Sequence, residues 1–325
     1  MWERYSLRPA LDSGPAFMPV FLYGTAWKKE QSADLVYIAV KAGFRAIDTA
    51  AQPRHYQEDL VGDGIRRAIA DGIVRREDLY VSPFKPTSPT DSCLTQAKVQ
   101  TKFSPVEAQD PNNMPYHPEA SVTEQVQTSV MSSLHNLRPS FDPASVDHAY
   151  IDALVIHSPL RTLELTLEAW SALETYVPHR IRNLGISNCS LPVLRELNDS
   201  PQVKVKPAVV QNRFYEDTLF DVSLRAFCRD HQIIYQSFWT LTANPDLVRS
   251  TPVQQLAAHT DISPAAALYA LVVSLSNVAV LNGTKDEGRM REDLAAPTRV
   301  EEFTHAQPEQ WQQIREKFRA LIKEE

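Results

Sequence analysis

The stretch Gly43-Phe-Arg-Ala-Ile-Asp-Thr-Ala50 places a short apolar run directly before the carboxylate of Asp48. This run predicts a buried strand over 44–49 that ends in a polar group. Helical periods lie on either side of it, over 30–42 and 58–71. The stretch is therefore one unit of an alternating strand and helix pattern, and the same pattern recurs along the chain.

Seven further strands are predicted at 20–25, from 79 onward, and at 151–157, 181–188, 208–212, 233–237 and 278–281. Later helices are predicted at 119–137, 162–175, 191–197, 219–230, 263–275 and 308–325. Eight alternating units in about 300 residues favour a single α/β domain, a (β/α)8 TIM barrel, over two doubly wound domains. We expect this domain to span 1–325, with an atypical insertion at 82–99 and a helical tail at 300–325.

The composition argues against several other classes of protein. The 325 residues carry a net charge of −7, so no general attraction to nucleic acid or anionic lipid is expected. Three widely spaced cysteines indicate a reducing compartment, and nine glycines make a glycine-rich dinucleotide loop unexpected. The start of the chain is charged where a signal peptide is apolar, and the apolar run at 265–275 is too short to cross a bilayer. We therefore expect a cytoplasmic protein, a monomer or weak homo-oligomer, with no nucleic-acid, membrane or metal partner.

Polar groups stand at the predicted carboxyl ends of nearly all the strands. They are Gly24 and Thr25, Asp48, Lys102, His157, Ser187 and Asn188, Gln211 and Asn212, and Gly283 and Thr284. Because TIM barrels carry their chemistry at this end of the strands, we expect one site there.

Several of these groups lie within longer motifs. After 43–50 come His55-Tyr56-Gln57-Glu58, Gln100-Thr-Lys102-Phe103, and the segments 150–159, 185–188, 210–212 and 283–293. In this order, over roughly 20–295, they resemble the aldo-keto reductase family. The resemblance implies an NAD(P)-dependent oxidoreductase of the alcohol dehydrogenase or carbonyl reductase type, which reduces a small-molecule aldehyde or ketone to an alcohol by hydride transfer.

The resemblance also implies a catalytic tetrad of Asp48, Tyr56, Lys102 and His157. A tyrosine, with an ordinary pKa of about 10, is a weak proton donor that a neighbouring ammonium can tune. Lys102 would supply that charge, Asp48 would hold Lys102, and His157 would donate a hydrogen bond to the substrate oxygen. Taken singly, Asp48 could be a helix cap, Tyr56 a loop aromatic and His157 a core histidine. His55 is interpreted as a loop residue only.

The cofactor-binding residues implied by the resemblance fall into two groups. Ser187, Asn188 and Gln211 would hold a nicotinamide carboxamide, while Arg289 would suit the 2′-phosphate of NADPH. The full set is Gly24, Thr25, Asp48, Ser187, Asn188, Gln211, Gln236, Ser237, Gly283, Thr284, Arg289, Glu292 and Asp293. Gly283 replaces a lysine common in the family, and Lys285 is a candidate substitute for it. We expect NADPH, with NADH as the alternative.

Three further features depart from the family pattern. Gln236 occupies the ring-stacking position, which leaves Tyr235 and Phe238 as alternatives for covering the nicotinamide. The insert between Asp48 and Tyr56 and a short, charged tail imply an open pocket for a bulky substrate. The segment 82–99 contains proline breakers, and we expect it to interrupt a strand whose register favours Lys102 over Lys85 as the catalytic lysine. The abrupt change of sequence where this segment meets the flanking motif also fits a retained intron.

The sequence leaves open two alternatives to a reductase function. One is a catalytically impaired barrel that binds a nicotinamide cofactor as a sensor or partner subunit. The other is an aldolase that forms a Schiff base through a lysine on the same barrel.

Overall fold

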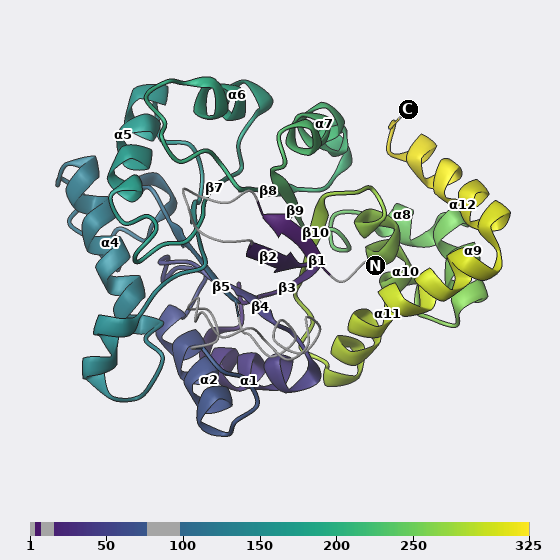
Figure 1. Cartoon of the computed structure of the whole chain (residues 1–325), viewed down its shortest axis with the longest axis horizontal. Coiled ribbons are helices and arrows are strands. Elements are labelled where there is room, and N and C mark those ends of the chain that lie inside the picture. Colours follow the sequence, from purple (N-terminus) through teal and green to yellow (C-terminus); the bar gives the residue numbers. More distant parts are fainter. Residues whose placement is uncertain (1–3, 8–15, 77–97, 325) are drawn as a thin grey trace, which may run out of the picture.

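Eight parallel strands close into a barrel in the computed structural model, which describes residues 4–7, 16–76 and 98–324 (Figure 1). The strands are β3 Phe21–Gly24, β4 Ala46–Asp48, β5 Lys98–Phe103, β6 Ala153–Ile156, β7 Leu184–Ser187, β8 Val209–Arg213, β9 Ile234–Phe238 and β10 Val278–Asn282. Strand β10 pairs with both β9 and β3, so the sheet has no free edge. The predicted (β/α)8 fold is confirmed.

Helices surround the barrel and connect successive strands. They are α1 Ser32–Ala42, α2 Glu58–Ala70, α4 Val122–Asn136, α5 Leu163–Glu174, α6 Leu191–Asp199, α7 Val222–Asp230 and α10 Pro264–Val273. Each presents an apolar stripe to the outer face of the sheet, and the largest hydrophobic core lies between the two layers. Because right-handed crossovers place every strand in the same direction, all eight carboxyl ends meet at one mouth.

A hairpin of β1 Arg4–Leu7 and β2 Ala16–Pro19 precedes the barrel and was not predicted. Met18 from β2 is buried in a second apolar cluster inside the barrel with Leu22, Val155 and Ile234, and with Ala46, Ala208, Val209 and Ala279. These residues pack the interior away from the mouth, so polar side chains are confined to the upper part of the barrel.

Four additional helices follow β9 and β10: α8 Pro245–Arg249, α9 Thr251–Thr260, α11 Glu287–Ala306 and α12 Pro308–Leu321. The tail helix α12 packs against α9 at the periphery, in yellow in Figure 1. In place of one helical tail over 300–325, the structure has α11, which begins at Glu287, and α12, which ends at Leu321. No single helix in the described ranges is long and apolar enough to cross a membrane; α9 and α10 pass that test only as a pair, bent by 104°.

The start of β5 corrects one expectation. We expected 82–99 to lie outside the strand, but β5 begins at Lys98 and includes Val99. The two residues suit a strand because the Val99 side chain is buried, while Lys98 forms an ion pair of 3.5 Å with Asp152. The strand predicted from 79 and the remainder of the insertion lie outside the described residues.

Candidate active site

A cavity of about 930 Å³ opens at the carboxyl ends of the strands. It is lined by twelve of the predicted site residues: Gly24, Asp48, Tyr56, His157, Ser187, Asn188, Gln211, Gly283, Thr284, Arg289, Glu292 and Asp293. Residues that are 269 positions apart in the chain thus face one space, because the barrel brings all the strand ends together.

A buried ion pair lies at the base of the catalytic end. Lys102 Nζ is 2.6 Å from Asp48 Oδ2 and also donates to the Thr49 carbonyl at 2.8 Å. Both side chains are at most 1 % exposed. Burial lowers the pKa of the Lys102 ammonium, but the charge of Asp48 and the nearby Tyr56 outweigh it and raise the pKa above its ordinary value. Lys102 is therefore a fixed positive charge.

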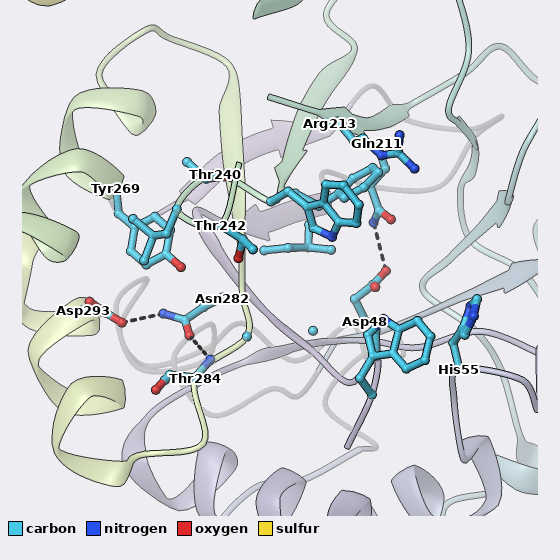
Figure 2. Close-up of a pocket in the computed structure, with 18 of the residues that line it drawn as sticks. Asp48, His55, Gln211, Arg213, Thr240, Thr242, Tyr269, Asn282, Thr284 and Asp293 are labelled. Carbon is cyan, nitrogen blue, oxygen red and sulfur yellow. Dashed lines mark hydrogen bonds between the residues drawn. The ribbon is translucent and has the colours of Figure 1, made fainter. Parts of the chain in front are cut away.

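Three amide side chains surround the Asp48 carboxylate and the ion pair. Gln100 Nε2 and Gln211 Nε2 donate to Asp48 Oδ1 at 2.7 and 3.0 Å, and Gln211 is shown in this contact in Figure 2. Gln236 Oε1 accepts from both of these amides, at 2.7 and 3.0 Å. Gln236 is thus a fixed part of the barrel interior.

Tyr56 is held over Lys102 by the loop that follows β4. Its backbone N–H donates to the Gln52 carbonyl at 3.0 Å, and Lys102 Nζ lies 5.1 Å from the centre of its ring. Burial raises the pKa of the Tyr56 hydroxyl, and the charge of Lys102 opposes this increase. We expected the ammonium to lower this pKa; in the structure its effect is smaller than that of burial.

His157 completes the group of four side chains. Its ring centre is 6.0 Å from that of Tyr56, in an edge-to-face arrangement, and its Nδ1 lies 2.6 Å from Ser104 Oγ. Burial and the charge of Lys102 lower the pKa of the imidazole to about 3, so His157 is neutral near pH 7.

The residues predicted to hold a carboxamide lie beside this group. Asn188, in a left-handed backbone conformation, donates through Nδ2 to the His157 carbonyl at 2.9 Å. Ser187 Oγ donates to the Gln211 carbonyl at 2.6 Å. The amide nitrogens of Asn188 and Gln211 already donate hydrogen bonds within the protein. Their side-chain carbonyl oxygens are left to accept from the two N–H donors of a carboxamide. This donor and acceptor set fits the expected cofactor.

The opposite end of the cavity contains the predicted adenosine-binding residues. Asn282 Nδ2 donates to Asp293 Oδ2 at 2.6 Å, and its Oδ1 accepts from the Thr284 backbone N–H at 3.0 Å (Figure 2). The guanidinium of Arg289 has no ion pair within 4.0 Å among the residues that the structure describes. Lys285 donates to Gln31 at 3.0 Å, while Lys28 donates to the Gly283 carbonyl.

Three predicted cofactor residues have other partners. Thr25 Oγ1 donates to the Asp48 carbonyl at 2.9 Å, Ser237 Oγ pairs with Thr240 at 2.8 Å, and Gln236 lies in the amide cluster. All three are fully buried. Their observed contacts position the strand ends and give no sign of a ligand contact.

Aromatic side chains form walls that the sequence analysis largely missed. Of the two alternatives for covering a nicotinamide ring, Phe238 lines the cavity, whereas Tyr235 is buried and donates to Asp221 at 3.0 Å. His55 also lines the cavity, with its ring 4.0 Å from that of Trp27. Trp239 lies beneath the Arg213 guanidinium, 4.5 Å away. The available signal was position: Phe238 is the last residue of β9, and Trp27, His55 and Trp239 follow the carboxyl ends of strands.

The sequence model of the aldo/keto reductase family matches residues 21–317. The chain belongs to this family. It is 28 % identical over 186 residues to an NAD(P)H-dependent D-xylose reductase of Pachysolen tannophilus, a match that covers 57 % of this chain and 52 % of that protein. It is 26 % identical over 313 residues to aldo-keto reductase family 1 member C21 of Mus musculus, covering 86 % and 83 % of the two chains.

The fold of this aldo/keto reductase also matches solved structures. An aldo/keto reductase from Brucella melitensis superposes with a TM-score of 0.63 at 19 % identity, over 92 % of this chain and 98 % of that one. This similarity supports the barrel assignment.

Proposed function

We propose that this aldo/keto reductase reduces an aldehyde or ketone to an alcohol with a nicotinamide cofactor, and that it prefers NADPH. The observation that carries the proposal is the buried Lys102–Asp48 pair beneath Tyr56, with His157 facing the same cavity. A barrel that only binds the cofactor would not need these four side chains at one point.

The chemistry divides between the cofactor and the protein. Reduced nicotinamide, when bound, supplies a hydride to the carbonyl carbon. Tyr56 holds a proton for the oxygen, and its raised pKa keeps that proton in place at neutral pH. Lys102 stabilises the tyrosinate left after proton transfer, and Asp48 keeps Lys102 charged. Neutral His157 orients the oxygen by a hydrogen bond.

The cavity walls indicate the substrate class. Trp27, His55, Phe238 and Trp239 surround the catalytic end, and both tryptophans are about half exposed. Such walls favour a bulky or aromatic carbonyl compound. Because one relative is named as a D-xylose reductase, a panel of substrates should include polyhydroxy aldehydes as well.

Tyr56→Phe tests the proposal directly. Removing the phenolic proton should lower NADPH-dependent reduction of 4-nitrobenzaldehyde by at least about a thousandfold. Cofactor affinity, measured by protein fluorescence, should remain close to that of the wild type. The matched control is Tyr37→Phe, since Tyr37 bonds to Asp71 on the outer layer.

The outcomes separate the alternatives. Substantial turnover by Tyr56→Phe would place the acid elsewhere. A wild-type chain that binds NADPH but oxidises none with any aldehyde or ketone would support the sensor or partner-subunit alternative. Trapping of a lysine adduct by borohydride would support an aldolase. We also propose that the enzyme acts in the cytoplasm as a monomer or weak homo-oligomer.

A further inference from the structure

Ser104 lies at the mouth of the barrel directly after β5. It follows Gln100 and Lys102 at two-residue intervals, and alternate residues of a strand point to the same face. Gln100 and Lys102 contact Asp48, and Ser104 contacts His157 one layer higher. Strand β5 and the residue that follows it thus supply three polar groups to the site at two-residue intervals.

The position of Ser104 is fixed from both sides. Its carbonyl accepts hydrogen bonds from the Tyr116 hydroxyl and from Gln109 Nε2. Gln109 Nε2 also donates to the Ala51 carbonyl at 2.9 Å, in the loop that leads to Tyr56. The Ser104 hydroxyl is therefore held in a constant place relative to the catalytic group.

The direction of the hydrogen bond between Ser104 Oγ and His157 Nδ1 follows from which of the two atoms carries the proton. Within the described part of the chain, His157 Nδ1 is the only partner of Ser104 Oγ. If Nδ1 carried the proton and donated, the hydroxyl hydrogen of fully buried Ser104 would have no acceptor, which is unfavourable. If Ser104 donates, Nδ1 accepts and the buried hydroxyl is satisfied.

We propose that Ser104 is a positioning residue whose hydroxyl donates to Nδ1 of His157 and fixes the neutral imidazole in the tautomer that carries its proton on Nε2. The Nε2–H group is then available to the cavity as a donor for a carbonyl oxygen. The tautomer is a property of the free protein. Its importance for reduction rests on the proposed function.

The tautomer can be read without any substrate. A two-bond ¹H–¹⁵N spectrum of histidine-labelled protein shows which ring nitrogen bears the proton, and the signals lost in His157→Gln assign the residue. We expect the proton on Nε2 in the wild type and a mixture of tautomers in Ser104→Ala. A proton on Nδ1 in the wild type, or an unchanged tautomer in Ser104→Ala, would overturn the proposal.

Kinetics test the consequence. Ser104→Ala should lower kcat for 4-nitrobenzaldehyde roughly tenfold, the effect of one hydrogen bond, with the Kd for NADPH unchanged. Ser104→Thr retains the hydroxyl and should keep most of the wild-type kcat. In a His157→Gln background, Ser104→Ala should change kcat by less than about twofold, because the residue it acts through is gone. Equal losses in both backgrounds would show a merely structural role.

The two readouts also separate this inference from the proposed function. If no carbonyl compound is reduced but the tautomer responds to Ser104 as expected, the proposed function fails and the positioning role stands. If reduction is rapid but insensitive to Ser104, the positioning role fails alone.

Discussion

Under the proposed function, Arg289 is predicted to decide between the two nicotinamide cofactors. It lines the end of the cavity that contains the predicted adenosine-binding residues, and a guanidinium binds a phosphate through charge-assisted hydrogen bonds. We expect Arg289→Ala to raise the Kd for NADPH about 10- to 100-fold and to leave the Kd for NADH nearly unchanged. Fluorescence titration with both cofactors measures the difference.

Arg291 offers a matched control on the same helix. It is exposed and paired with Glu287 at 2.5 Å, so Arg291→Ala should affect neither cofactor. Equal weakening of NADPH and NADH by Arg289→Ala would mean that the guanidinium contacts some other part of the cofactor.

Individual site residues were predictable from the sequence where a strand ends in a polar group. Asp48, Lys102 and His157 satisfy that rule, and the structure brings them together with Tyr56. Ser104 was missed because a serine after a strand has many ordinary uses. The choice between Tyr235 and Phe238 could not be made, because it depends on which face of β9 turns inward.

Among the elements, β5 shows why strand positions were easier to predict than strand ends. Its alternation places Val99 and Thr101 toward the helices and Gln100 and Lys102 toward the interior. Period-two patterning therefore sets the face of every residue. The beginning of the strand depends on the pairing of Lys98 with Asp152, a contact between segments far apart in the chain.

The second turn of helix α11 carries a buried carboxyl group, that of Asp293, whose pKa is raised. Burial, with a smaller effect of Glu292, raises the pKa of Asp293 from 3.8 to about 6. The native state then binds more protons than the unfolded state between these values, so this group makes stability fall as the pH rises from about 4 to 6. The decrease amounts to at most about 3 kcal/mol.

Asp293→Asn should remove this dependence while keeping the acceptor for Asn282. Relative to the wild type, the variant should gain free energy of unfolding between about pH 4 and 6 and hold a constant advantage at higher pH. Urea unfolding across this range, without cofactor, measures the difference. A difference that is the same at every pH would contradict the raised pKa.

At the scale of the whole molecule, barrel closure explains which features of the fold could be predicted from the sequence and which could not. Eight alternating units left few topologies other than a closed barrel, so the fold followed from the count. The β1–β2 hairpin did not follow, because its role depends on Met18 entering an apolar cluster formed by several strands. Such a cluster exists only once the barrel has closed.

We predict that the barrel also closes in a chain that lacks the segment 82–99. Deleting it joins Val81 to Gln100, and Tyr80 and Val81 then take the register positions of Lys98 and Val99, opposite Ala46 and Ile47. Val81 then occupies the buried position that Val99 holds in the full chain. The connection from Arg76 is reduced to three residues, which span about 14 Å at most.

A span of about 14 Å is sufficient, because the Asp152 carboxylate binds residues on both sides of the new junction. Asp152 Oδ2 accepts from Arg76 Nη1 at 2.6 Å and from the Val99 backbone N–H at 2.8 Å. Of the side-chain contacts that the described residues Lys98 and Val99 make, the ion pair of Lys98 with Asp152 would be lost. We therefore expect the shortened chain to fold and to be at least as stable and as active with NADPH as the 325-residue form, with the ion pair between Lys102 and Asp48 retained.

Thermal unfolding and NADPH-dependent rates of the two forms measure this, and transcript sequencing shows whether 82–99 is a retained intron. In the full chain, Lys102→Met should abolish activity, because it leaves Asp48 buried without its cation and Tyr56 without its neighbouring charge. Lys85→Met, at a position outside the described residues, should be active. An inactive shortened chain, or the reverse result for the two lysines, would show that the segment supplies part of the active site.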